Sequence, residues 1–221
     1  MTQQERQQRS REEIYQAALE EFGAHGYDGT TVEQICRRHG ISKGMMYHYY
    51  AGKDELFLLC VERTFQALRD HLEREAERMA QAPFPAAVRD FFMARERFFQ
   101  ANPREKAVFE NALLYPPGPL TQRIQALHAP LRELNQRFFL RLAPQMPLRP
   151  GLSPEDVFHY LEGVGRCFQA MLACGQAGHE IRDVHTLLEA GGKLMDLVLF
   201  GVLRQPTPAP AEMKEEKKVT L

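Results

Sequence analysis

The stretch over residues 42–53 contains the side chains best suited to recognising another molecule. If residues 43–50 form a helix, Met46 and Tyr50 lie four residues apart and can pack against Val32 and Ile35. The positions left facing outward are Lys43, Gly44, Met45, Tyr47 and His48. They supply a cation, a backbone that allows close approach, a hydroxyl and an imidazole, and Lys53 is placed to meet a flanking phosphate. These groups at this spacing predict a helix that enters a groove of double-stranded DNA.

Two short helices joined by a glycine turn would position these residues. Thr31 and Ser42 each stand where a side-chain oxygen caps the start of a helix, and Gly40 ends the first of the two. Residues 31–50 therefore have the layout of a helix-turn-helix motif. A helix before them is predicted by apolar residues at helical spacing, namely Ile14, Ala17, Ala18 and Phe22.

At these residues the sequence resembles the TetR family of transcriptional regulators. The resemblance rests on the ordered pattern Phe22-Gly23, Gly26-Tyr27, Thr30-Thr31-Val32, Ile35, Gly40-Ile41-Ser42-Lys43-Gly44, Tyr47, Tyr50, Lys53 and Leu56. It covers about Arg9 to Arg63 and implies a helical regulatory domain for the rest of the chain. Carried over residue by residue, it implies phosphate contacts from Thr31, Tyr47 and Lys53. It also implies groove contacts, beside the capping Ser42, from Lys43, Gly44, Met45 and His48.

The sequence departs from the family pattern at two of these positions. Met45 stands where such proteins often carry a small or hydroxyl-bearing residue. A methionine can contact a thymine methyl group but cannot donate a strong hydrogen bond. Tyr50 stands where phenylalanine is frequent, and it can still pack with its hydroxyl in solvent.

Other interpretations of the same segment stay open. Tyr47 can be an ordinary packing aromatic, and His48 can equally be a histidine that only faces solvent. Arg37 and Arg38 resemble a nucleic-acid patch, yet cations at a helix C-terminus also fit a solvated helix end.

The rest of the chain predicts further helices. Leu56, Leu59, Cys60, Phe65, Leu68 and Leu72 predict a long helix from Asp54 to about Met79 that joins two domains. Later helices are predicted over 86–101, 103–114, 120–142 with a bend or interruption at Pro130, 154–175 and 181–203. The fold class is therefore all-α, with an N-terminal three-helix helix-turn-helix domain joined by a long helix to a C-terminal helical bundle.

We expect four segments along the chain. A flexible N-terminus covers residues 1–8, and the DNA-binding domain covers 9–53. The ligand-binding and dimerisation domain covers 54–204. The tail over 205–221 alternates proline with small residues and ends in charge, so it is expected to be disordered.

The predicted bundle offers candidates for ligand binding and for self-association. Four aromatic residues can line an apolar cavity, although they can equally fill a core: Phe98, Phe99, Phe109 and Phe168. Apolar stripes on the last two helices exceed what one small core needs and predict a homodimer, with an intramolecular core as the alternative. These stripes contain Tyr160, Val164, Cys167, Met171, Leu187, Leu188, Leu194, Met195 and Val198.

Composition restricts the possible functions. With 28 basic and 29 acidic residues the net charge is −1, so any attraction to DNA must be local. The chain starts with polar residues and has no apolar run of about 18 residues, which predicts a cytoplasmic protein without a membrane partner. The cysteines form no CxxC pair and the histidines are scattered, so no disulfide, metal or cofactor is expected.

The sequence therefore predicts a non-enzymatic, sequence-specific regulator. We expect a repressor that a small, apolar ligand releases from a palindromic operator. The long helix is expected to carry the effect of the ligand to the DNA-reading helix. A helical enzyme, or a cofactor- or metal-binding sensor that uses the Phe-rich bundle, is the alternative.

Overall fold

The structure of the chain is a computed structural model that describes residues 2–79, 81–83, 86–160 and 163. Within these residues every regular element is a helix, which confirms the all-α prediction. The α-helices are α1 (Gln3–His25), α2 (Val32–His39), α3 (Lys43–Tyr49), α4 (Lys53–Arg78), α5 (Ala86–Ala101), α6 (Pro103–Leu114) and α7 (Thr121–Leu142). Short 3-10 turns, η1 (Gly118–Leu120) and η2 (Ala143–Gln145), flank α7, and residues 154–160 are helical.

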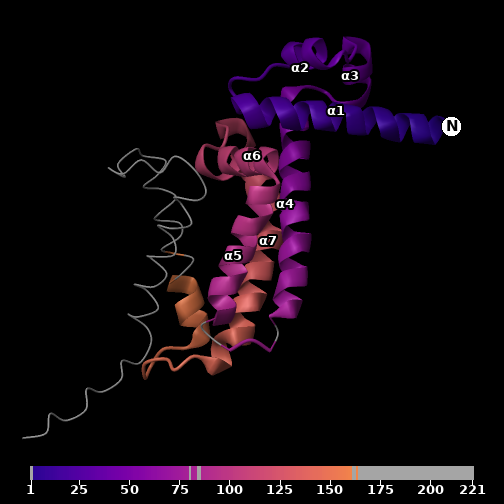
Figure 1. Cartoon of the computed structure of the whole chain (residues 1–221). Helices are drawn as coiled ribbons and strands as arrows, with labels where there is room; N and C mark the ends of the chain where they lie inside the picture. Colours follow the sequence, from indigo (N-terminus) through magenta and orange to yellow (C-terminus); the bar gives the residue numbers. More distant parts are fainter. Residues whose placement is uncertain (1, 80, 84–85, 161–162, 164–221) are drawn as a thin grey trace, which may run out of the picture.

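These helices form two parts that share α4 (Figure 1). We call α1–α3 the reader domain; it lies across one end of α4. We call α5–α7, together with the part of α4 that they cover, the body. Within the described residues no helix combines the length and apolar character needed to cross a membrane.

Side-chain caps explain where the first three helices begin. The Thr31 hydroxyl accepts the Gln34 N–H at 3.2 Å, and Ser42 Oγ accepts the Met45 N–H at 3.1 Å. Gly40 adopts φ 65°, a left-handed conformation that favours glycine, and this gives the tight turn between α2 and α3. The expected capping residues therefore define the helix-turn-helix.

The prediction of a flexible segment over residues 1–8 is corrected, because α1 begins at Gln3. Thr2 and Glu5 form a reciprocal capping box: the Thr2 N–H donates to the Glu5 carboxylate at 2.7 Å, and the Thr2 hydroxyl accepts the Glu5 N–H at 3.2 Å. Such a box satisfies backbone donors that would otherwise be free at a helix start. A polar composition alone did not reveal this cap.

The core of the reader domain contains the predicted apolar faces. Ile14, Phe22, Ile35 and Met46 are fully buried. Phe57 of α4 is also fully buried, and its ring lies edge-on to that of Phe22 with centroids 5.1 Å apart. Burying a large apolar side chain stabilises a fold by about 1.5–3 kcal/mol, so this cluster fixes the reader domain on α4.

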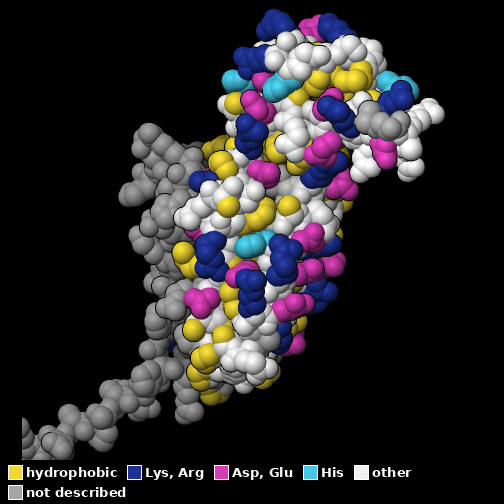
Figure 2. Space-filling model, turned by 45° about the vertical axis from the view of Figure 1, so that its right-hand side comes forward, with side chains coloured by type: hydrophobic (Ala, Val, Ile, Leu, Met, Phe, Trp, Pro, Cys, Tyr) yellow, Lys and Arg dark blue, Asp and Glu magenta, His cyan; other side chains and the backbone are white. Residues whose placement is uncertain are grey.

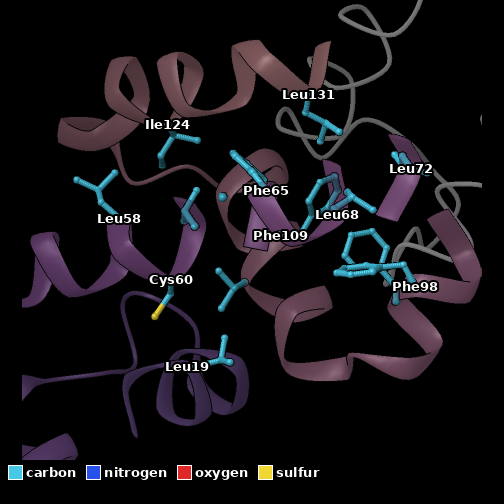
Figure 3. Packing of buried hydrophobic residues seen from close by; sticks show 14 of the residues in the cluster. Leu19, Leu58, Cys60, Phe65, Leu68, Leu72, Phe98, Phe109, Ile124 and Leu131 are labelled. Atoms are coloured by element: carbon cyan, nitrogen blue, oxygen red, sulfur yellow. The ribbon is translucent and has the colours of Figure 1, made fainter. Parts of the chain in front are cut away.

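Helix α4 runs through the core of both parts, as predicted. Figure 3 shows Phe65, Leu68 and Leu72 of α4 next to side chains of several other helices. Those neighbours are Phe98 of α5, Phe109 of α6, and Ile124 and Leu131 of α7, whereas Leu19 of α1 lies on the side of Cys60, another α4 residue. One helix therefore packs against both the reader domain and the body.

Helix α7 is continuous through Pro130, so of the bend or interruption expected there the interruption is absent. Proline removes one helical hydrogen bond, which leaves the carbonyl of the residue four positions earlier without its donor. Both Pro130 and Ala126 are exposed, so water can hydrate that carbonyl.

Several predictions concern residues outside the described part of the chain. These are Phe168 among the ligand candidates, the tail 205–221, and all the dimer candidates except Tyr160: Val164, Cys167, Met171, Leu187, Leu188, Leu194, Met195 and Val198. Tyr160 is described and is 58% exposed.

Candidate nucleic-acid interface

Helix α3 has the predicted division into a buried and an outward face. Met46 is fully buried, whereas Tyr47 is 55% exposed, and Lys43 and His48 are also exposed. Met45 differs from the expectation because it is only half-exposed and packs against the core. The outward face of α3 therefore presents a cation, a phenol and an imidazole, with a thioether at its edge.

Lys43 is held by an ion pair that the sequence did not predict. Its Nζ lies 2.5 Å from Glu33 Oε1 on α2, across the turn of the motif. This contact raises the pKa of Lys43 and lowers the pKa of Glu33. Both side chains are exposed, so a DNA contact by Lys43 requires exchange of the carboxylate for an acceptor on DNA.

The other predicted polar contacts lie at helix N-termini. The hydroxyls of Thr31 and Ser42 cap α2 and α3, while both residues stay exposed. The N-terminus of a helix attracts anions because its first N–H groups are free and its dipole is positive there. Both ends are therefore suited to phosphate oxygens.

Lys53, at the start of α4, is positioned by an aromatic ring. Its Nζ lies 4.0 Å from the centroid of the Tyr27 ring, and the Tyr27 hydroxyl donates to Asp54 Oδ1 at 2.5 Å. Burial, and then this hydrogen bond, raise the pKa of Tyr27 to about 12, so the phenol stays protonated. The sequence identified Lys53 but gave no signal that Tyr27 supports it.

Two cations near the motif have different surroundings. Arg38 Nη1 lies 2.8 Å from the carboxylate of Glu21, which is only 4% exposed, so Arg38 links α2 to α1. Arg38 is also exposed in the last turn of α2, which agrees with its interpretation as a solvated helix end, and its charge has a structural partner in addition. Arg11 lies over the ring of Tyr49, 5.4 Å from its centroid, and was not singled out from the sequence. Figure 2 shows Lys and Arg side chains on the reader domain and also over the body, mixed with Asp and Glu in both parts.

The aromatic ligand candidates pack against one another. Phe98, Phe99 and Phe109 are each less than a tenth exposed. The ring centroids of Phe99 and Phe109 are 4.8 Å apart, and those of Phe98 and Phe99 are 5.3 Å apart. These rings therefore fill the core between α5 and α6, which is the alternative that the sequence left open.

A surface hollow that the sequence did not predict lies between α4 and α7. It has a volume of about 400 Å³ and begins at Tyr50, directly after the reading helix. Its lining residues are Tyr50, Glu55, Leu58, Leu59, Glu62, Arg123, Ala126 and Leu127. A smaller hollow of about 140 Å³ continues it toward Pro130.

Contacts between α1 and α6 join the reader domain to the body at a second place besides α4. The Tyr27 N–H donates to Asn111 Oδ1 at 3.1 Å, and Arg104 lies 2.8 Å from the carboxylate of Glu20. A Cβ added at Gly23 would lie 3.3 Å from Arg104, so the two helices approach closely there. Sequence periodicity gave no indication of this pairing.

No group of three or more potential metal ligands occurs among the residues that the structure describes. Cys36 and Cys60 are buried free thiols there, and burial raises the pKa of both. A raised pKa keeps a thiol protonated and unreactive.

Comparison with known proteins agrees with this arrangement. Residues 14–60 match the family model described as bacterial regulatory proteins, tetR family. The HTH-type transcriptional repressor AcnR of Corynebacterium diphtheriae is 32% identical over 87 residues, which are 39% of this chain and 42% of that protein. The chain thus matches less than half the length of the curated relatives.

Solved structures match most of the chain at low identity. A putative TetR-family regulator from Mesorhizobium loti has a TM-score of 0.61 at 19% identity, covering 92% of this chain and 100% of its own. The SmeT–triclosan complex has a TM-score of 0.59 at 24% identity, covering 91% and 99%. At such identities the likeness shows the fold. Residues 14–60 therefore match the tetR family model, and the chain as a whole has the fold of these solved structures.

Proposed function

We propose that this chain is a transcriptional repressor that binds a palindromic operator as a homodimer and leaves it when a small apolar molecule binds the body. The observation that carries the DNA-binding part is the outward face of α3, where Lys43, Tyr47 and His48 are exposed opposite the buried Met46. As a DNA-binding protein it would act in the cytoplasm. The relatives are named as transcriptional repressors, and none supports the alternative of a helical enzyme.

The residues of the interface divide into two roles. Lys43, Gly44, Met45 and His48 lie on the part of α3 that would face base edges in the major groove. Thr31, Ser42, Tyr47 and Lys53 lie around it, at helix starts or on the exposed flank, where phosphates would pass. Phosphate contacts fix the position of the helix, and base contacts then select the sequence.

The dimer is proposed because one short helix touches few base pairs. Two copies related by a two-fold axis would read half-sites about 34–36 Å apart. The apolar stripes on the last two predicted helices are the proposed interface. Leu188→Glu should give a monomer in sedimentation with weak operator binding, whereas a dimeric variant would exclude this interface.

Release by a ligand is proposed to act through α4 and α6, which both contact the reader domain and the body. The neighbour SmeT was solved with triclosan, which makes a small apolar molecule a reasonable effector class here. Typical coupling weakens operator binding by roughly 5–150-fold, and the operator must weaken ligand binding by the same factor.

Selection from a random DNA pool tests the proposal. We expect the full chain to enrich a palindrome and to bind it far more tightly than unrelated DNA at the same salt concentration. Small apolar molecules are then screened for those that reduce this binding. Failure to enrich any sequence would contradict the proposed DNA-reading function.

A further inference from the structure

A polar cluster in the body differs from every ion pair described above. It consists of Arg95 on α5 with His128 and Asn135 on α7, and we call it the Arg95 cluster. Arg95 Nη2 donates to Asn135 Oδ1 at 3.2 Å. Arg95 Nε is buried, and within the described residues it has no hydrogen-bond partner.

The Arg95 cluster carries positive charge without a matching acid among the described residues. Loss of hydration lowers the pKa of Arg95 to about 10. Burial, followed by the charges of Arg95 and Arg132, lowers the pKa of His128 to about 4, so this ring is neutral at pH 7. By contrast, Arg38, Arg63, Arg97 and Arg104 each lie within 3.2 Å of a glutamate oxygen.

A buried cation without a counter-ion is unfavourable, and an anion that reaches it is bound strongly. Arg95 as a whole retains some accessible surface, while its Nε is buried. A guanidinium can bind a carboxylate through two parallel hydrogen bonds, and the neutral His128 can donate a further one.

Aromatic side chains surround the cluster. Phe98 and Phe99 follow Arg95 by three and four positions, so they lie on the same side of α5. The ring centroids of Phe65 and His128 are 5.2 Å apart, and Phe109 lies next to both Phe65 and Phe99. Figure 3 shows Phe65 and Phe109 together in this part of the core. A molecule that reaches Arg95 therefore meets apolar surface around the charge.

We propose that the Arg95 cluster binds the acidic group of an otherwise apolar effector, with Arg95 as the cation and Asn135 and His128 as its hydrogen-bonding neighbours. This inference rests on the proposed function, because it specifies the chemistry of the ligand that the body binds. The proposed effector is an anionic amphipathic molecule, and neutral or cationic molecules should bind the body more weakly.

Two fluorescent probes with the same aromatic skeleton test the proposal. 1-Anilinonaphthalene-8-sulfonate carries an acid, and N-phenyl-1-naphthylamine lacks it. The chain has no tryptophan, so its own emission interferes little. We expect the full-length protein to bind the sulfonate at least about tenfold more tightly, as a charge-assisted contact at a desolvated site provides. Equal affinities for the two probes would overturn the proposal.

Three variants locate the effect. Arg95→Met should remove the preference for the sulfonate and leave affinity for the neutral probe unchanged. Asn135→Asp would supply an internal carboxylate to Arg95, so it should weaken sulfonate binding by about tenfold and raise the melting temperature. Arg97→Met, an exposed position on the same helix, is the matched control and should keep the preference.

The outcomes separate this inference from the proposed function. If Arg95→Met or Asn135→Asp binds the sulfonate as the unchanged protein does, the Arg95 cluster is not the site. If Arg95→Met fails to fold, Asn135→Asp still decides the question. Operator selection is measured independently of probe binding. If the Arg95→Met and Asn135→Asp variants keep the preference for the sulfonate and still bind the operator, the anion site is refuted and the proposed DNA-binding function is not.

Discussion

The reader domain and the body place their candidate binding residues differently, on the surface in the first and in the interior in the second. In the reader domain Tyr47 and Lys43 are exposed, and the apolar side chains lie beneath them. In the body Phe98 and Phe99 are buried, and the cation Arg95, three and four positions before them on α5, has Asn135 as its hydrogen-bond acceptor. The reader domain therefore has its proposed DNA-contacting groups on a surface, as a polymer such as DNA requires. The body has its proposed ligand-contacting groups in the interior, where a small molecule would have to enter.

The two regions also differ in how they are held to each other. Phe57 joins them through the core, while the hydrogen bond from Tyr27 to Asn111 and the ion pair between Arg104 and Glu20 join them nearer the surface. Removing a buried packing contact costs much stability, whereas removing one polar contact near the surface costs little. Substitutions in the core and substitutions at the polar contacts should therefore affect stability and DNA binding differently.

The largest expected effect is the difference in stability between a variant of a buried residue, Phe57, and a variant of an exposed residue, Tyr47. Phe57→Ala should destabilise the fold by about 3–5 kcal/mol, because it leaves a cavity against Phe22. Tyr47→Ala should change stability by no more than about 0.5 kcal/mol and yet weaken DNA binding. Urea unfolding followed by circular dichroism measures the first effect, and fluorescence anisotropy measures the second. A large loss of stability in Tyr47→Ala would mean that α3 does not present this residue as described.

The next largest effect is a loss of stability of the fold at acidic pH, caused by His128 in the body. The ordinary pKa of histidine is 6.5, whereas that of His128 is lowered to about 4 in the folded chain. As the pH falls below 6.5 the unfolded chain takes up this proton first, so stability is full above that pH and decreases toward pH 4. His128 should contribute a loss of about 2 kcal/mol between pH 7 and pH 5.

His128→Gln removes the titrating ring and should reduce the slope of stability against pH in this range. Unfolding at pH 5, 6 and 7 compares the two proteins. Equal slopes would show that His128 is hydrated like an ordinary surface histidine.

A smaller effect is expected at the junction of α1 and α6. Asn111→Ala leaves the half-buried Tyr27 N–H without its acceptor, which should cost about 1–2 kcal/mol of stability. It should also reduce the factor by which an effector weakens operator binding, because the second connection then keeps only the Arg104–Glu20 ion pair and the packing at Gly23. Titrating operator with and without effector checks this. An unchanged factor would leave α4 as the sole connection between the regions.

The smallest effect is an increase in affinity. Glu33→Gln frees Lys43 from its ion pair and should strengthen DNA binding by about twofold to fivefold at low salt, with less gain at high salt. Glu73→Gln, which removes an exposed ion pair with Arg137 in the body, is the control and should have no such effect. A loss of affinity in Glu33→Gln would show that Glu33 positions Lys43 rather than competing for it.

Local signals in the sequence predicted much of the reader domain. Thr31, Ser42 and Gly40 act within a few residues of their own positions, so their types suffice to locate α2 and α3. The burial of Met46 follows in the same way from helical spacing. Nearby residues thus determine both the helix-turn-helix and its outward face.

Contacts between distant segments could not be predicted in this way. Asn111 and Tyr27 are 84 residues apart in the chain, and periodicity contains no information about such pairs. The same holds for the contact of Tyr27 with Lys53. It also holds for Arg95, which forms no ion pair with any of the described acidic residues. Phe98, Phe99 and Phe109 are buried, but helical spacing alone could not tell whether they fill a core or line a binding site.

The most direct measurement of the central claim compares the DNA sequences selected by two variants of α3. Lys43→Ala removes a proposed base contact, and Tyr47→Phe removes a proposed phosphate contact while keeping the ring. Selection from a random pool should give an altered preferred sequence for Lys43→Ala. Tyr47→Phe should select the original palindrome but bind it and all other DNA more weakly. The account is contradicted if Tyr47→Phe changes the selected sequence while Lys43→Ala leaves it unchanged.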